Sequence, residues 1–244
     1  MKKKKSFKEN FLTLLYAILA AVIIRSFLFE PFSIPSGSMY PTLKVGDYLF
    51  VSKFDYGFNR HSLPFSIPII PVRLFYKSPK RGDVVVFKTP EDNKTDYIKR
   101  VIGLPGDKIR MQSSEIYINN IKLKRDFQGT EKYKSFEIDL YKETLPDGTN
   151  YKIYEMKDDI LFFETNDFSE LIIPEETFFV IGDNRDNSQD SRFIGPIPKK
   201  NLVGKGRVVL LSIDIEKTTW LTFWKWFGAL RKDRIWFSLI PNEN

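Results

Sequence analysis

Cysteine is missing from this 244-residue sequence, and histidine occurs once, as His61. Without cysteine the chain has no disulfide, no thiolate zinc site and no cysteine nucleophile. With one histidine it has no two-histidine metal site, and any Ser-His-Asp triad has to use His61. His61 lies just ahead of a proline-rich loop, where a histidine is ordinarily solvated, so we do not expect it to be catalytic. We expect an activity that needs neither a metal nor another cofactor.

The net positive charge is also small once the N-terminus is set aside. The net charge is +7, but residues 1–10 hold five lysines against one glutamate and supply +4 of it. A nucleic-acid partner would require a basic face on the folded body, so none is expected. With 42% apolar and 28% charged residues the chain can bury a core, and its length suits one domain or two modest ones.

One long apolar run stands at the N-terminus. Residues 11–24 carry no charge, and the run continues past Arg25 to Phe29. As a helix, this run spans about 28 Å, close to the thickness of a bilayer core. A cleaved signal peptide and a buried core helix are the alternatives. A signal peptide would need an Ala-x-Ala site after the run, and a core helix at the edge of a domain would need a polar stripe; the segment has neither. We predict a transmembrane anchor over residues 11–29.

The lysines before this run predict its orientation. By the positive-inside rule, residues 1–10 form a basic cytoplasmic tail, and everything after residue 30 lies on the outer side. The expected localisation is a single pass through the inner (cytoplasmic) membrane, with the body of the chain on the periplasmic side.

Beyond the anchor, the sequence is typical of a mainly β protein. Runs rich in β-branched and aromatic residues alternate with Gly-Asp pairs that favour turns. No long helical period is present between residues 31 and 215. Residues 110–177 are rich in Lys, Glu, Asp and Tyr and look like an inserted accessory β subdomain. Strands are predicted at Tyr48–Phe54, Asp83–Lys88, Tyr97–Ile102, Glu115–Asn119, Phe178–Ile181 and Arg207–Ile213.

Two serines flank Gly37 just beyond the anchor. Glycine allows a tight turn on which Ser38 can present its hydroxyl, although such a triplet is more often a plain turn. A nucleophilic serine needs a base, and without a usable histidine the plausible base is a lysine. Lys99 lies between Tyr97 and Val101 on one face of a strand, where burial would lower its pKa and free the amine to accept a proton. On spacing alone, a solvated strand lysine is the alternative.

A third polar segment follows the strand predicted at Phe178–Ile181. Residues 182–195 read GDNRDNSQDSRFIG and alternate aspartate with arginine. A solvated loop and a metal loop are both conceivable, but the glutamate and the spacing of an EF-hand are missing. The alternation favours a folded cluster of ion pairs that shapes a site.

Four motifs occur in order behind the anchor: PSGSMYPTL, RGDVVVFKTP, DYIKRVIGLPGDKI and GDNRDNSQDSRFIGPI. Together they strongly resemble the bacterial type I signal peptidases, which are Ser/Lys leader peptidases. The resemblance covers roughly residues 30–109 and 178–215. It implies that these stretches form an antiparallel, β-rich catalytic domain and that residues 110–177 stand where the family carries a variable second domain.

The resemblance also implies roles for individual residues. Ser38 matches the nucleophile and Lys99 matches the general base. Ser36 matches the hydroxyl of the oxyanion hole, and Ser188 matches the serine that orients the lysine. The supporting polar cluster is matched by Asp183, Arg185, Asp190 and Arg192. The lining of the substrate groove is matched by Phe32, Ile34, Pro35, Tyr97 and Ile98.

The function so implied is that of a membrane-bound serine endopeptidase that removes N-terminal signal peptides from exported preproteins after small residues. Its partners would be signal peptides and membrane lipid, close to the protein-export machinery. A self-cleaving Ser/Lys repressor would need a DNA-binding domain where this chain has its anchor. A membrane-tethered binding module, in which Ser38 and Lys99 are purely structural, is the other alternative.

All four tryptophans fall near the C-terminus, in residues 216–244. Basic residues, Arg231 and Arg234 among them, flank this cluster. One interpretation is that the stretch packs on its own domain. The other, favoured by tryptophan and basic residues at membrane interfaces, is that it lies flat on the outer leaflet beside the active site. An apolar stripe at helical steps would be formed by Trp220, Phe223, Trp224, Phe227 and Leu230.

Overall fold

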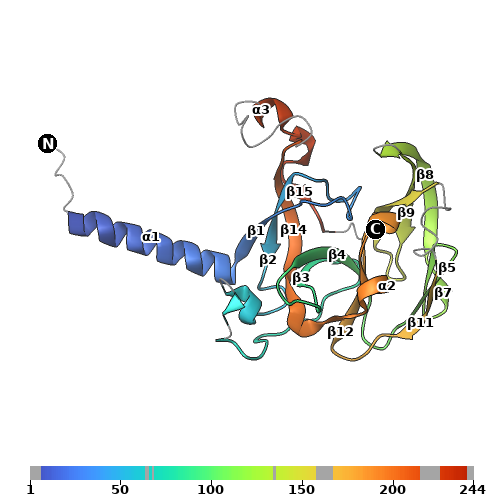
Figure 1. Ribbon diagram of the computed structural model, residues 1–244, viewed down its shortest axis with the longest axis horizontal. Helices are drawn as coiled ribbons and strands as arrows, with labels where there is room; N and C mark the ends of the chain where they lie inside the picture. The colour runs from blue at the N-terminus through green and yellow to red at the C-terminus, as the bar shows by residue number, and fades with distance from the viewer. Residues whose placement is uncertain are drawn as a thin grey trace.

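The computed structural model describes residues 7–63, 66, 67, 69–133, 136–157, 167–214 and 226–240. One long helix, α1 (Phe7–Phe27), projects from a body of antiparallel strands (Figure 1). Within the described part of that body, the α-helices are single turns, α2 (Ser191–Ile194) and α3 (Trp226–Ala229). The expected class, a mainly β protein behind an N-terminal helix, is confirmed.

Helix α1 is apolar on all sides and exposed along its length, with Ser26 as its one buried residue. It spans about 32 Å, and among the described residues it is the one helix long and apolar enough to cross a membrane. Within the described residues the helix already includes Phe7, ahead of residue 11. It ends at Phe27, so Phe29, which the prediction placed in the anchor, instead opens strand β1 (Phe29–Ser33). Leu28 alone separates the helix from the sheet.

The main sheet has eight strands among the described residues, and all of its pairs are antiparallel. Five of the strands were predicted, although β14 begins at Leu202 rather than at Arg207. The pattern does not predict β1, because Pro31 interrupts its short run; proline is tolerated there since β1 is an edge strand. The spatial order is β1, β2 (Asp47–Ser52), β14 (Leu202–Ser212), β3 (Val84–Lys88), β4 (Asp96–Gly103), β12 (Thr177–Ile181) and β13 (Ile197–Pro198), with β15 (Phe237–Ser238) paired to β14.

Strand β3 lies near the centre of this sheet and is buried on both faces, as its unbroken apolar run indicates. Val84 and Val86 pack into one apolar cluster, and Val85 packs into another on the opposite face. Met39 and Leu43 belong to the first cluster and are fully buried. The turn that carries the two flanking serines is therefore rooted in the core.

Two further sheets lie between β4 and β12, where an inserted β subdomain was expected. The predicted strand at Glu115–Asn119 is present as β6 (Glu115–Ile118). The insert shares one apolar cluster with the main sheet, because Ile109 and Ile153 pack with Ile102 and Phe179. One sheet has the order β11 (Phe168–Ile172), β5 (Lys108–Gln112), β6, β7 (Ile121–Lys122), and the other has the order β10 (Asn150–Met156), β9 (Phe136–Thr144), β8 (Lys124–Tyr133).

The described part of the C-terminal stretch packs on the main sheet. Leu239 is buried in the core, and the guanidinium of Arg234 pairs with Asp47 at 2.5 and 3.0 Å. Arg231 pairs with Asp214 at 3.3 Å. For these two arginines, the internal partners agree with the interpretation that the stretch packs on its own domain. Trp220, Phe223 and Trp224, on which the membrane interpretation chiefly rests, lie outside the described residues.

Candidate active site

The segment between β1 and β2 carries the serines of the first motif. Its turn is fastened to the loop after β12, since Asn184 donates from its backbone N–H to the Ser38 carbonyl at 3.1 Å and from Nδ2 to the Gly37 carbonyl at 2.9 Å. Gly182 lets the two loops approach, because a Cβ there would lie 2.6 Å from the Ser38 carbonyl oxygen and 2.1 Å from Ser188 Oγ. A larger residue at position 182 would push them apart.

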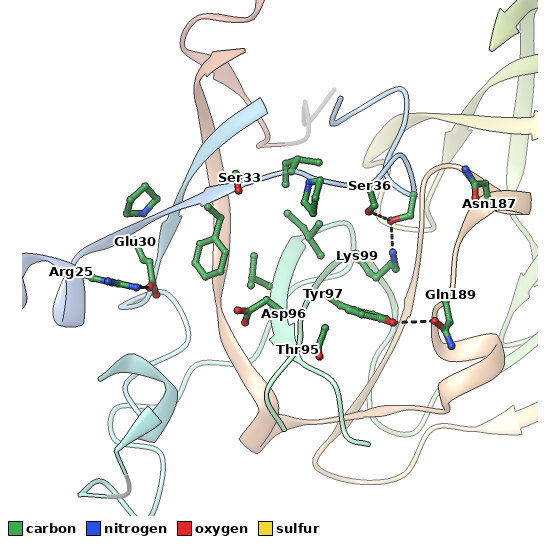
Figure 2. Close-up of a pocket in the computed structure, with 17 residues that line it drawn as sticks. Arg25, Glu30, Ser33, Ser36, Thr95, Asp96, Tyr97, Lys99, Asn187 and Gln189 are labelled. Atoms are coloured by element: carbon green, nitrogen blue, oxygen red, sulfur yellow. Dashed lines mark hydrogen bonds and ion pairs between the residues drawn. The ribbon is translucent and has the colours of Figure 1, made fainter. Parts of the chain in front are cut away.

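Strand β4 brings Lys99 to this turn. Its Nζ lies 2.5 Å from Ser38 Oγ, and the two residues are 4% and 8% exposed. Tyr97 and Val101 share the face of Lys99, as the strand alternation predicts, and Nζ lies 5.6 Å from the centre of the Tyr97 ring. Figure 2 shows the amine directed toward the nucleophile turn beside Ser36. The geometry thus unites the predicted serine and lysine.

Burial lowers the pKa of Lys99 from its ordinary value to about 8. The charges of Asp190 and Asp183 oppose this shift, and the charge of Arg192 adds to it. With a pKa near 8, about one amine in ten is neutral at pH 7. A neutral amine in hydrogen-bond contact with a hydroxyl can act as a general base.

Ser36 lies on the solvent side of the pair. Its Oγ is 3.5 Å from Ser38 Oγ, and the residue is exposed. A hydroxyl in this position can turn toward an atom bound to Ser38, which is the requirement for an oxyanion donor.

Asp190 organises the loop that faces Lys99. Its carboxylate is fully buried and accepts from Ser188 Oγ at 2.7 Å, from the Gly182 N–H at 2.9 Å and from Arg192 at 2.9 Å. Burial alone would raise the pKa of Asp190, but Arg192 and these other donors hold it below its ordinary value. The hydroxyl of Ser188 therefore donates to Asp190 and keeps its lone pairs for a donor such as Lys99, although the structure has no Ser188–Lys99 hydrogen bond.

Asp183 belongs to a different ion pair from Asp190. It accepts from the guanidinium of Arg100 at 2.8 and 2.6 Å and from the Thr42 hydroxyl at 2.5 Å. Arg100 is buried directly after Lys99 and points to the opposite face of β4. The Arg100–Asp183 ion pair thereby fastens β4, the strand that carries Lys99, to the loop after β12. Arg100 was not among the predicted site residues, although strand alternation already places it on the face opposite Lys99.

Arg185 reaches into the inserted sheets. It forms a bidentate pair with Glu143 of β9, which is completely buried and also accepts from Arg125 and from the Tyr151 hydroxyl. Burial would raise the pKa of Glu143, but Arg185 and Arg125 hold it at about 2. The four residues predicted as one polar cluster are thus divided among three separate ion pairs, and the insert supports one of them.

A cavity of about 680 Å³ leads away from the serine–lysine pair, between edge strand β1 and the start of β4. Figure 2 shows Ser36 and Lys99 at one end and Arg25 with Glu30 at the other. At this far end Arg25 pairs with Glu30 at 2.6 Å, close to the end of α1. All the residues predicted to line a groove are in its wall: Phe32, Ile34, Pro35, Tyr97 and Ile98.

His61 is buried, contrary to the expectation of a solvated side chain. Its Nδ1 lies 3.0 Å from Ser66 Oγ, and it stands in a short 3-10 helix whose N-cap is Asn59. Burial, followed by the charge of Arg60, lowers its pKa to about 4, so the ring is neutral at pH 7. It does not line the cavity of Ser38. Within the described ranges, no three acidic or imidazole side chains gather where they could ligate a metal ion.

The family model described as "Signal peptidase, peptidase S26" matches residues 7–211. The match places the chain in a class of peptidases. Signal peptidase I of Rickettsia typhi is 37% identical over 260 residues, covering 98% of this chain and 96% of the relative. Signal peptidase I of Rickettsia massiliae is 36% identical over 258 residues, with the same coverage. The chain belongs to the signal peptidase family, peptidase S26.

Among solved structures, a signal peptidase I from Enterococcus faecalis is similar to this chain at 26% identity. The match covers 53% of this chain and 97% of that one, with a TM-score of 0.34. A score of this size is too low for a comparison of the two folds.

Proposed function

We propose that this protein is a membrane-bound serine endopeptidase that uses Ser38 and Lys99 to remove signal peptides from exported preproteins. The observation that carries the proposal is the 2.5 Å separation of Lys99 Nζ and Ser38 Oγ, both buried at the end of a peptide-sized groove. Family membership supports the same reaction, since the relatives are named signal peptidase I.

In the first half of the reaction, neutral Lys99 accepts the proton of the Ser38 hydroxyl as its oxygen attacks the scissile carbonyl carbon. The carbonyl oxygen becomes an oxyanion, and the hydroxyl of Ser36, whose Oγ lies 3.5 Å from Ser38 Oγ on the open side of Ser38, stabilises it. The ammonium of Lys99 then protonates the departing amine. The new N-terminus leaves, and the signal peptide remains as an ester on Ser38.

In the second half, the same lysine activates water. The amine of Lys99 removes a proton from a water molecule, which attacks the ester carbonyl. The carbon–oxygen bond to Ser38 then breaks, the ammonium of Lys99 returns the proton to Ser38 Oγ, and the acid is released. Ser188 and Asp190 hold the wall beside the amine in one arrangement throughout, because Asp190 is tied to Arg192 and to the Gly182 N–H. The pair thus performs both proton transfers without histidine.

The groove suits an extended peptide. It runs between edge strand β1, which pairs with β2 on one side only, and the first residues of β4. Free strand edges bind peptides by adding a strand, with alternate side chains entering pockets. Ile34, Ile98 and Val86 give the groove an apolar lining. The preference for small side chains before the cleaved bond is what the family resemblance implies.

The anchor places this groove at a membrane surface. Helix α1 is joined to β1 by Leu28, and Arg25 near its end lines the cavity itself. A substrate that spans the bilayer beside α1 would leave the membrane at the mouth of the groove. We propose a single pass with residues 1–10 in the cytoplasm and the catalytic body on the outer, periplasmic side, near the export machinery.

The test is cleavage of a purified preprotein by the full chain in detergent micelles. We expect one cut, after the small residue that ends the signal peptide, and no cut by the Ser38→Ala variant. Ser169→Ala, which removes an exposed hydroxyl from β11, is the matched control and should cleave normally. Full cleavage by Ser38→Ala would show that Ser38 is not the nucleophile, whereas no cleavage by the unmodified chain would favour the membrane-tethered binding module.

A further inference from the structure

An apolar loop that catalysis does not use lies at residues 69–75. Four of its side chains are strongly exposed: Ile69 at 73%, Val72 at 65%, Leu74 at 45% and Phe75 at 81%. Water-soluble surfaces rarely gather so many large apolar side chains in one short segment, and where they do, the patch has a partner.

This apolar loop is fixed beside the end of the anchor. Leu74 pairs with Phe58 through two backbone hydrogen bonds, of 2.8 and 2.9 Å. The ring of Phe58 in turn packs edge-on against Phe27, the last residue of α1, with centroids 5.4 Å apart. Figure 1 shows the chain around residues 58–75 next to the end of α1, on the side of the body from which the helix projects. A helix that crosses the bilayer therefore carries the apolar loop to the level where the bilayer ends.

A basic pocket of about 540 Å³ opens between the apolar loop and the segment before β14. Its charged lining consists of four cations and one acid, Glu176, which pairs with Lys199. Arg73 satisfies its guanidinium with backbone carbonyls, including Gly57 at 2.9 Å, rather than with a carboxylate. The remaining cations are Arg60 and Lys200. The pocket therefore carries an excess of positive charge.

We propose that the apolar loop inserts into the outer leaflet and that the basic pocket takes the phosphate of an anionic phospholipid headgroup. The combination is specific to a lipid surface: the exposed side chains match acyl chains, the cations beside them match headgroups, and the anchor holds both at the interface. This second attachment fixes the rotation of the body about α1, so that the groove faces the bilayer. The inference rests on the proposed role of α1 as a membrane anchor.

The absence of cysteine from the sequence makes the test direct. Single cysteines are introduced into the full chain by Val72→Cys in the apolar loop, by Leu15→Cys in α1 and by Ile121→Cys on β7. Each variant carries a polarity-sensitive fluorophore and is reconstituted into vesicles of phosphatidylcholine and phosphatidylglycerol in equal parts. Ile121 is the matched control, because it is 61% exposed against 65% for Val72 and lies in the insert.

We expect lipid-borne quenchers to reduce the emission of the labels at positions 15 and 72, with a blue shift at both, and to leave position 121 unchanged. Quenching at 15 without quenching at 72 overturns the inference while the anchor stands. Equal quenching at 72 and 121 also overturns it, since contact would then be unspecific. A label at 15 that stays unquenched refutes the anchor and the inference with it.

The headgroup part has its own test. One cation near an anionic leaflet favours the bound state by about five-fold, so Lys200→Gln should lower the ratio of quenched to unquenched label at position 72 by about that factor. Lys152→Gln, the same change on exposed β10, should not alter it. In vesicles of phosphatidylcholine alone, Lys200→Gln should have no effect. If Lys200→Gln and Lys152→Gln behave alike in the anionic vesicles, the pocket does not bind a headgroup.

Discussion

Two buried lysines have opposite surroundings: Lys99 lines the groove beside Ser38, and Lys53 pairs with Glu30, which lines the other end of the groove. Lys99 is 4% exposed and contacts a serine hydroxyl, 2.5 Å away. Lys53 is 2% exposed and contacts the carboxylate of Glu30, 2.8 Å away, and the Ser62 carbonyl, also 2.8 Å away. Burial lowers the pKa of both amines, but at Lys53 the hydrogen bond and the charge of Glu30 oppose the shift most strongly.

The comparison shows that burial alone does not make a lysine a base. A carboxylate in contact stabilises the ammonium form, so Lys53 serves as a structural cation beneath the start of β1. A hydroxyl in contact with the amine leaves its neutral form accessible. The two carboxylates whose charges act on Lys99, those of Asp183 and Asp190, accept hydrogen bonds from Arg100 and Arg192 instead. The arginine pairs thus keep acids close to Lys99 without letting them hold its proton.

The largest expected effect comes from Lys99→Arg. Arginine keeps the charge but does not give up its proton at working pH, so turnover should fall by roughly 10⁴–10⁶, as when a member of a catalytic triad is removed. Single-turnover cleavage of a preprotein measures this loss. Lys53→Arg is the matched control and should stay close to the wild-type rate, because its role requires a cation. A Lys99→Arg enzyme within ten-fold of the wild type would end the assignment of Lys99 as base.

Ser36→Ala should have the next largest effect. It removes one donor to the developing oxyanion while Ser38 and Lys99 remain, and the loss of one such donor typically costs about 10²–10³ in kcat. KM should change little, because the bond strengthens in the transition state. Steady-state kinetics with a peptide substrate separates the two. A change confined to KM would indicate that Ser36 only shapes the groove.

The pH dependence is smaller and has a definite sign. The base must be neutral, so kcat/KM should rise about ten-fold per pH unit up to about pH 8, the pKa of Lys99, and then level off. The charge of Asp190 raises the pKa of Lys99, so Asp190→Asn should move the inflection to lower pH, whatever it does to the height of the curve. An inflection that stays in place or moves upward would contradict this electrostatic coupling.

Part of this site could be predicted from short sequence motifs. Ser38 and Lys99 could be predicted because four motifs in order resemble a known family; the spacing of either residue alone left a plain turn and a solvated strand lysine open. Arg100 and Glu143 were missed because their partners, Asp183 and Arg185, stand 83 and 42 positions away. The spacing of residues within one segment cannot predict such ion pairs, because they form only when strands that are distant in the sequence pack together.

The fold shows the same division. The apolar runs of β3 and β12 predict their strands, whereas edge strand β1 has no run to detect. For the C-terminal stretch, composition left packing on the domain and contact with lipid as two open interpretations. Arg234 belongs to the first, but its partner Asp47 lies 187 positions earlier, so no local pattern could have shown this ion pair.

The smallest effect on catalysis is expected at Lys53, where a substitution should lower stability and leave turnover unchanged, the opposite of the effect at Lys99. Lys53→Met leaves the Glu30 carboxylate with Arg25, a partner that is largely exposed. An under-paired, mostly buried carboxylate costs about 1–3 kcal/mol, so thermal melting in detergent should occur at lower temperature while kcat stays close to the wild-type value. Adding Glu30→Gln removes the unpaired charge, and the double variant should therefore melt above Lys53→Met alone. If instead the double variant is the less stable of the two, Glu30 is held by something other than this pair, and Lys53 is not the structural counterpart of Lys99.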